Sequence, residues 1–221
     1  MNAPFQSLSL EKYRALLIDI DNTLYAYEPC NQVALKTCYQ DFIRTPGVRS
    51  TSEADFQAQY KNYRTLITNR YYPKAICRSR ALAFLEYFMA LELPDAQALS
   101  LRFENTYWDS FIAHMRLFPS ALTLLQEAKK AELTVVAVTD MTTDVQLRKL
   151  SALGVSEYID HVVTSEIAGI EKPSPVIFSL ALQKAGVSAS EAIMVGDDLE
   201  KDIKGAHAMG IKAFQVIASE T

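Results

Sequence analysis

Two carboxylates end a short apolar run near the start of the chain, and this run limits the possible folds more than any other segment. The stretch Leu16–Ile20 is apolar apart from Asp19, and Asp21 follows directly. Acidic side chains are rarely buried at the end of a core strand unless a positive charge meets them there. We therefore expect a buried strand that carries both acids to a site for a divalent cation.

Short β-branched runs alternate with amphipathic helical stretches over residues 13–24 and 116–221. Runs that are apolar on both sides are typical of parallel strands covered on both faces. The pattern predicts an α/β fold with a doubly wound parallel sheet. The expected strands are Ala15–Ile20, Leu133–Thr139, His161–Thr164, Ala192–Val195 and Ala213–Ile217. The expected helices run from Pro119 to about Ala131, from Thr142 or Thr143 to Leu153, from about Pro173 to Gly186, and from about Glu200 to Met209.

The middle of the chain has a different texture, with few β-branched runs and many aromatic, alanine and leucine residues at helical spacing. Breaks at Pro46-Gly47, Pro73 and Pro94 indicate about four helices. We expect a helical insertion over residues 28–115 and a core built from residues 1–27 and 116–221. The expected linkers lie near Tyr25–Pro29 and Arg116–Pro119. The aromatic residues of the insertion are interpreted as a second small core rather than a cofactor site.

Composition excludes several classes of function. The chain has 221 residues, 49% of them hydrophobic and 22% charged, with a net charge of −4. This charge argues against binding a nucleic acid polymer or an anionic membrane. Cys30, Cys38 and Cys77 show no spacing typical of disulfides or zinc, so we expect reduced, buried thiols. We see no signal peptide in Met1–Leu10 and no apolar run of membrane-spanning length, and we expect a cytoplasmic protein.

Further polar residues stand where other expected strands end. The carboxyl ends of parallel strands meet at one edge of the sheet, where such folds bind ligands. Asp197 follows the apolar run 193–196, and we expect it to join Asp19 and Asp21 around Mg²⁺, which prefers about six oxygen ligands. Thr139 offers a hydroxyl to a phosphate oxygen, and Lys172 offers a positive charge. Each residue alone has an ordinary structural explanation, but their common order at strand ends favours one site.

These residues resemble four motifs of the haloacid-dehalogenase-like hydrolase superfamily, in the members with a helical cap inserted after the first motif. The matching segments are Asp19–Thr23, Thr139, Lys172 and Gly196–Asp202. The resemblance covers essentially the whole chain and implies a Rossmann-like catalytic core at both ends with the cap between them. It also implies a Mg²⁺-dependent phosphatase that hydrolyses a small soluble phosphomonoester through an aspartyl-phosphate.

The resemblance assigns a role to each acid. Asp19 is the nucleophile that attacks phosphorus. Asp21 is the general acid for the leaving oxygen and then the base that activates water. Mg²⁺ is held by Asp19, by the backbone carbonyl of Asp21 and by Asp197. Asp202, or Asp198 in its place, supports the metal or Lys172 without binding the metal directly.

The resemblance also assigns the phosphate-binding residues. Thr139 hydrogen-bonds the transferring phosphoryl group, and Lys172 stabilises Asp19 and the developing charge. Asp140 stands beside this phosphate site, where a neutral polar residue is common in the family. An extra carboxylate there is unfavourable unless it points away or pairs with a cation, and we expect it to cap the following helix.

Alternatives stay open within this resemblance. An acid at position 21 favours an oxygen leaving group, hence a phosphatase or a phosphomutase rather than a dehalogenase. Asn22 stands where glycine is commonest, and asparagine tolerates left-handed backbone. The sequence from Asp19 to Tyr25 also resembles the pyrimidine 5′-nucleotidase-like branch. A non-enzymatic receiver-like phosphoacceptor domain is the alternative outside the superfamily.

The substrate is expected to be a small phosphorylated metabolite that the cap recognises. The protein is expected to be a monomer or a homodimer. Tyr25 and Tyr27 could line the entrance to the site. A group of basic residues in the insertion could bind a second anion, although a solvated charged face is the simpler interpretation. These residues are Arg64, Arg70, Lys74, Arg78 and Arg80.

Overall fold

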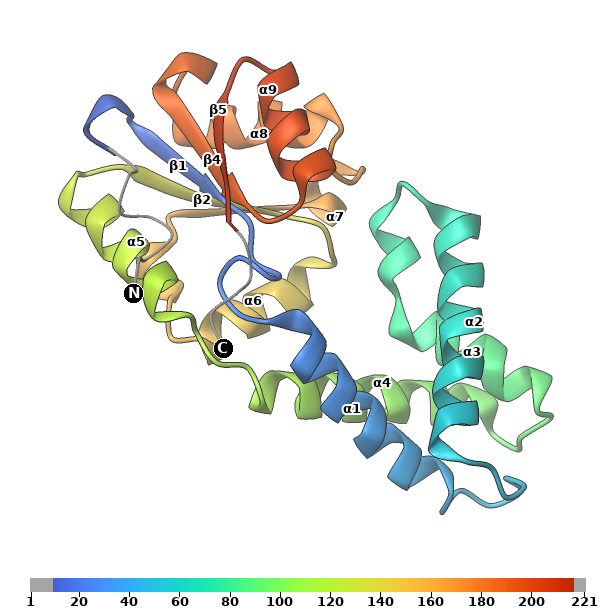
Figure 1. Ribbon diagram of the computed structural model, residues 1–221. Coiled ribbons are helices and arrows are strands. Elements are labelled where there is room, and N and C mark those ends of the chain that lie inside the picture. Colours follow the sequence, from blue (N-terminus) through green and yellow to red (C-terminus); the bar gives the residue numbers. More distant parts are fainter. Residues whose placement is uncertain (1–9, 217–221) are drawn as a thin grey trace. The chain divides into compact units, whose positions relative to one another are not determined.

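The computed structural model describes residues 10–216 (Figure 1), which fall into two compact units. The first unit joins Met1–Tyr27 to Met115–Thr221, and the second is Glu28–His114. The expectations for residues 1–9, and for Ile217 at the end of the last strand, lie outside the described residues.

The first unit contains a five-stranded, entirely parallel sheet of order β3-β2-β1-β4-β5. The strands are β1 (Ala15–Ile18), β2 (Thr134–Thr139), β3 (His161–Thr164), β4 (Ala192–Gly196) and β5 (Lys212–Gln215). This arrangement confirms the predicted α/β fold class. The first strand ends at Ile18 rather than Ile20, although the amide of Asp19 still donates to the carbonyl of Val195 at 2.9 Å.

Helices cover both faces of this sheet. Right-handed crossovers place α5 (Pro119–Lys130) and α6 (Thr143–Ala152) on one face. The crossover direction reverses after β3, so α8 (Pro175–Ala185) and α9 (Gly205–Ala208) lie on the other face (Figure 1). Short helical turns complete the unit at Leu10–Lys12, Ser156–Tyr158, Ser165–Ala168 (α7) and Ala189–Glu191.

The helix expected from about Glu200 to Met209 is interrupted. Leu199–Lys204 forms a π-helical turn, and α9 follows it. The amide of Ile203 donates to the carbonyl of Asp198, five residues earlier, at 3.2 Å. The wider turn lies directly after β4, at the edge where the polar residues gather.

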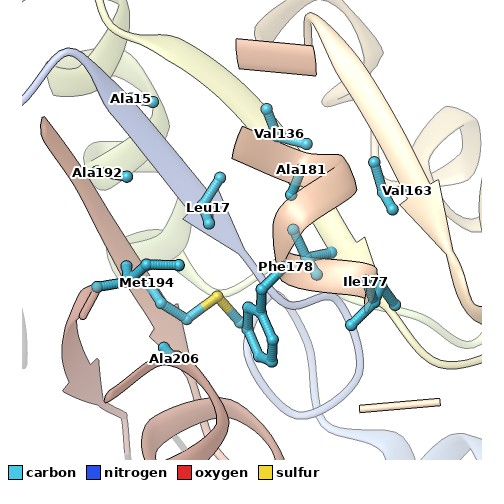
Figure 2. Packing of buried hydrophobic residues seen from close by; sticks show 12 residues of the cluster. Ala15, Leu17, Val136, Val163, Ile177, Phe178, Ala181, Ala192, Met194 and Ala206 are labelled. Carbon is cyan, nitrogen blue, oxygen red and sulfur yellow. The ribbon is translucent and has the colours of Figure 1, made fainter. Parts of the chain in front are cut away.

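One face of the sheet packs against α8 and α9 through fully apolar side chains (Figure 2). Alternate strand residues such as Leu17, Val136 and Met194 point to this face, because side chains alternate along a strand. Phe178 and Ile177 of α8 lie over them, and both are completely buried. This apolar layer makes the sheet a rigid support for the loops at its edge.

Replacing Phe178 by alanine is expected to lower the free energy of unfolding by about 3–5 kcal/mol, because a buried ring is lost and a cavity remains. Urea denaturation followed by circular dichroism measures this change. Val176→Ala is the matched control on the same helix, since Val176 is 51% exposed and should change stability little. Equal effects of the two substitutions would contradict the assigned packing.

The second unit is helical. It contains α1 (Tyr27–Phe42), α2 (Glu53–Tyr71), a 3₁₀ turn (Ala75–Arg78), α3 (Arg80–Ala90) and α4 (Ala96–Ala113). The linker expected at Tyr25–Pro29 is wrong in its second half, because α1 already begins at Tyr27. Pro29 is tolerated there, since the first turn of a helix has no use for its missing N–H.

Aromatic side chains fill the interior of the helical unit, as expected. Phe42, Phe56, Phe84 and Phe103 are buried, and neighbouring ring centroids lie 4.8–6.4 Å apart, as in the pairs Phe42–Phe56 and Phe42–Phe103. All three cysteines of the chain are buried. Within residues 10–216, no helix has both the length and the apolar character needed to cross a membrane.

Candidate active site

The polar residues gather where the strand order reverses. The chain runs outward from β1 to β2 and β3, and then returns to β4 on the other side of β1. Ligands of such folds bind in the crevice at this point, outside the carboxyl ends of the strands. Asp19 follows β1, Asp197 follows β4, and Thr139 is the last residue of β2. The topology therefore brings residues from both ends of the chain to one edge.

Lys172 links two acids at this edge. Its Nζ donates to Asp19 Oδ1 at 2.6 Å, to Asp202 Oδ1 at 2.7 Å and to the carbonyl of Val138 at 3.0 Å. All three charged side chains are at most 7% exposed. Burial alone would lower the pKa of Lys172, but the neighbouring carboxylates outweigh it and raise that pKa well above its usual value. The ammonium group therefore stays charged.

Asp19, Asp197 and Asp202 form an acidic cluster whose carboxylate oxygens lie within 4.8 Å of one another. Burial raises the pKa of Asp19 well above its usual value, and the like charges of Asp202 and Asp21 add to the effect against the opposing charge of Lys172. Burial and the charge of Asp202 also raise the pKa of Asp197, to about 6. The cluster is therefore deficient in positive charge.

A divalent cation suits this cluster. Three ionised carboxylates bring three negative charges against the one positive charge of Lys172, which leaves the two that such an ion neutralises. Carboxylate oxygens are also the ligands that Mg²⁺ prefers. Asp202, expected only as a supporting residue, contacts Lys172 and belongs to the cluster. Asp202 lies close to the backbone of Gly196. Only glycine allows this, since a Cβ at position 196 would lie 2.7 Å from the Cβ of Asp202.

Asp21 points to a second buried lysine, which the sequence did not reveal. Lys149 Nζ donates to Asp21 Oδ1 at 2.6 Å, and the hydroxyl of Tyr25 donates to the same oxygen. Gln146 Nε2 donates to Asp21 Oδ2 at 3.2 Å. Burial alone would raise the pKa of Asp21, but the charge of Lys149 and these hydrogen bonds leave it below its usual value. Tyr25 is completely buried, so the expectation that it lines an entrance is wrong.

Thr139 is buried at the end of β2 and contacts Gln146. Gln146 Nε2 donates to Thr139 Oγ1 at 2.7 Å. The threonine hydroxyl uses an acceptor lone pair in this bond, so its own hydrogen can be donated elsewhere. The geometry suits the expected contact with a phosphoryl oxygen.

Asp140 does not cap the following helix, so that expectation is wrong. The residue before α6 is Thr142, whose own side chain makes no capping bond. The amide of Thr143, the first residue of α6, donates instead to Glu166 Oε2 at 2.8 Å. Asp140 Oδ1 instead accepts from the amide of Lys172 at 2.8 Å, and Oδ2 accepts from Lys201 Nζ at 2.6 Å. Lys201 also bonds the buried Glu171 at 3.0 Å. The extra carboxylate thus pairs with a cation and fixes the peptide that carries Lys172.

Asp198 and Asn22 shape the loops of the site. The side chain of Asp198 accepts from the amides of Glu200 and Lys201, so it caps the π-helical turn. Its own amide donates to Asp202 Oδ2 at 3.1 Å, which supports Asp202 from the backbone. Asn22 has a φ of 60°, the left-handed conformation that asparagine tolerates, and its side chain accepts from the amide of Tyr27.

Three of the five basic residues named above, Arg64, Arg70 and Arg80, have structural contacts within the helical unit. Arg64 donates to the carbonyls of Cys77 and Ser79, and Arg70 pairs with Glu86 at 2.8 Å. Arg80 is 6% exposed and lies 4.8 Å from the ring centroid of Tyr107. These contacts give no support to a second anion site, and the buried Arg80 does not belong to a solvated charged face.

Comparison with known proteins agrees with this geometry. Residues 13–210 match the family model described as haloacid dehalogenase-like hydrolase. A ribulose-1,5-bisphosphate 5-phosphatase of Halopiger xanaduensis is 38% identical over 93% of this chain and 85% of its own length. A glyceraldehyde 3-phosphate phosphatase of Methanopyrus kandleri is 27% identical over 92% and 83%.

Solved structures share the fold. A 2-haloacid dehalogenase from Pseudomonas syringae superposes with a TM-score of 0.77 at 22% identity, covering 92% of this chain and 86% of that one. The match over residues 13–210 includes every motif residue described above. The chain therefore belongs to the haloacid dehalogenase-like hydrolases.

Proposed function

We propose that this hydrolase is a Mg²⁺-dependent phosphatase that cleaves small phosphomonoesters through an aspartyl-phosphate on Asp19. The observation that carries the proposal is the buried pair of Asp19 and Lys172, with Asp197 and Asp202 beside it. Lys172 holds one oxygen of Asp19 and leaves the other for reaction. Phosphatases among the relatives support the same reaction class.

The first half of the reaction transfers the phosphoryl group to the enzyme. A carboxylate oxygen of Asp19 forms a bond to phosphorus, and the bond from phosphorus to the ester oxygen breaks. Asp21 gives a proton to the departing alkoxide, which leaves as an alcohol. Asp21 must first take up that proton against the lowered pKa that Lys149 and its hydrogen bonds give it. Thr139 and Lys172 donate to the phosphoryl oxygens and to Asp19 while charge moves between them.

The second half releases phosphate. Asp21, now a carboxylate, removes a proton from water as the water oxygen bonds to phosphorus. The bond between Asp19 and phosphorus breaks, inorganic phosphate leaves, and Asp19 is restored. Splitting the hydrolysis into two displacements lets one nearby acid–base group serve both.

The acidic cluster would hold Mg²⁺ through the side chains of Asp19 and Asp197 and the backbone carbonyl of Asp21, with Asp202 supporting it. When bound, the ion supplies charge neutralisation and orientation for the phosphate group. The protein's own residues then position the ester and exclude water. We assign the helical unit, residues 28–115, the role of the cap that contacts the rest of the substrate.

Added Mg²⁺ is expected to raise the unfolding temperature, because an ion that binds only the folded chain stabilises it. At a concentration about 100 times its Kd the gain is about 2.7 kcal/mol. Asp197→Asn should remove most of this gain, since it deletes one ligand. Thermal unfolding with and without EDTA measures both effects.

The matched control for this substitution is Asp144→Asn, which changes an exposed carboxylate of α6 in the same way. It should respond to Mg²⁺ as the natural chain does. An identical response from Asp197→Asn would contradict the assigned metal site.

The relatives named for ribulose and glyceraldehyde phosphates favour a small sugar phosphate as substrate. A panel of phosphorylated metabolites, assayed with Mg²⁺ for release of inorganic phosphate, tests the proposal. It should include triose, pentose and hexose phosphates and pyrimidine nucleotides. Phosphorus NMR of the products separates a phosphatase from a phosphomutase, which moves phosphate without releasing it. Membership of a hydrolase family leaves the receiver-like alternative without support.

A further inference from the structure

We propose that Lys149 and Gln146 are positioning residues that fix the carboxyl group of Asp21 for proton transfer. The inference rests on the proposed function, in which Asp21 donates a proton to the leaving oxygen. Both residues belong to α6, which follows β2 in the chain, and both lie outside the four motifs. They would act through Asp21 and need no contact with the substrate.

The contacts define the orientation of the Asp21 carboxyl group. Its Oδ1 receives Lys149 Nζ at 2.6 Å and the hydroxyl of Tyr25, and its Oδ2 receives Gln146 Nε2 at 3.2 Å. Donors on both oxygens restrict rotation about the bond that carries the carboxyl group. The carboxyl side chain is 26% exposed, so it remains accessible at the edge of the sheet.

Gln146 also ties Asp21 to the phosphate-binding end of β2. Besides Asp21, its Nε2 donates to Thr139 Oγ1 at 2.7 Å and to the carbonyl of Asp140 at 3.2 Å. The Asp21 carboxylate and the Asp140 carbonyl determine which end of the amide faces them, since a flipped amide would oppose its oxygen to both of these acceptors. One amide group therefore sets the spacing between Asp21 and Thr139.

The burial of Lys149 argues for more than packing. Its side chain is 0% exposed, although it carries a charge. Burying an ion pair often gives no net stability over apolar residues of similar volume, so stability alone does not require a lysine here. Gln146 and Lys149 stand three residues apart, which places them on one face of α6 beneath Asp21. A helix is a more precise support for a functional group than a loop.

A misplaced Asp21 should impair proton donation more than phosphoryl binding. Esters with poor leaving groups need that proton, whereas a nitrophenolate leaves readily without it. Loss of Lys149 or Gln146 should therefore lower kcat/KM for an alkyl phosphate, which reports the first half of the reaction, by about 10²-fold, the lower end of general acid catalysis. The kcat/KM for p-nitrophenyl phosphate should change little, whereas kcat also reports the release of phosphate, in which Asp21 acts as the base.

The experiment compares Lys149→Met, Gln146→Met and Asp21→Asn on p-nitrophenyl phosphate and on a simple alkyl phosphate, in the full chain with Mg²⁺. Lys130→Met is the matched control, because it removes an exposed ammonium group from α5 of the same unit. The double variant Lys149→Met, Asp21→Asn closes a thermodynamic cycle. Circular dichroism confirms that each variant is folded, and Gln146→Met tests the inference without removing a charge if Lys149→Met does not fold.

The expected result is a leaving-group dependence in both single variants that matches the direction seen for Asp21→Asn, with no further loss in the double variant. Equal losses of kcat/KM on both esters, or additive losses in the double variant, would overturn the inference and indicate a purely structural role. If Asp21→Asn itself shows no leaving-group dependence, the role of Asp21 in the proposed function fails instead. The two failures are therefore distinguishable.

Discussion

Asp19→Asn is expected to abolish phosphate release, with a fall in kcat on the order of 10⁴-fold or more, as when other enzymes lose their nucleophile. The amide is the same size as the carboxylate, so it fits the buried position beside Lys172. It lacks the negative oxygen that forms the bond to phosphorus. Release of inorganic phosphate from p-nitrophenyl phosphate with Mg²⁺ measures the loss.

Two further measurements make this result specific. Asp144→Asn, the exposed carboxylate control on α6, should keep the natural rate. Mass spectrometry of the acid-quenched natural enzyme should show one added phosphoryl group that hydroxylamine removes, and the Asp19→Asn protein should show none. A variant that turns over at a near-natural rate would rule out Asp19 as the nucleophile.

The sequence predicted the sheet because its central strands, β1, β2 and β4, are buried on both faces. Runs such as Val135–Val138 have no polar side, so hydrophobic burial determines them whatever surrounds them. Strand ends were less predictable: Ile20 is fully buried yet lies beyond β1, since the chain turns there to deliver Asp19. Burial pattern alone does not distinguish a strand residue from a buried loop residue.

The acids of the site were predictable from their position at strand ends, but their partners were not. Lys149 and Gln146 occupy a helix whose pattern is ordinary, and their partners Asp21 and Thr139 come from other parts of the chain. The prediction that Asp140 caps a helix was wrong because its ion-pair partner, Lys201, lies 61 positions further along the chain. Long-range pairs of this kind leave no local signal, whereas the spacing of Asp19 and Asp21 does.

Lys172→Met is expected to reduce both activity and stability. The variant removes the ammonium group that lies 2.6 Å from Asp19 Oδ1 and 2.7 Å from Asp202 Oδ1, so two buried carboxylates lose their shared cation. Removing one partner of a buried ion pair typically costs about 3–5 kcal/mol. The kcat should fall by about 10²–10³-fold, as when one preorganised donor to developing charge is deleted. Urea denaturation and phosphate release measure the two effects separately.

A second substitution separates the electrostatic cost from the catalytic one. In the double variant Lys172→Met, Asp202→Asn, one of the two facing carboxylates becomes neutral, so much of the lost unfolding free energy should return. The activity should not return, because no ammonium group then reaches Asp19. Added Mg²⁺ should stabilise Lys172→Met more than the natural chain, since the ion then offsets one more uncompensated negative charge. Recovery of activity together with stability would mean that Lys172 supports only the fold, and that phosphoryl transfer in this enzyme proceeds without it.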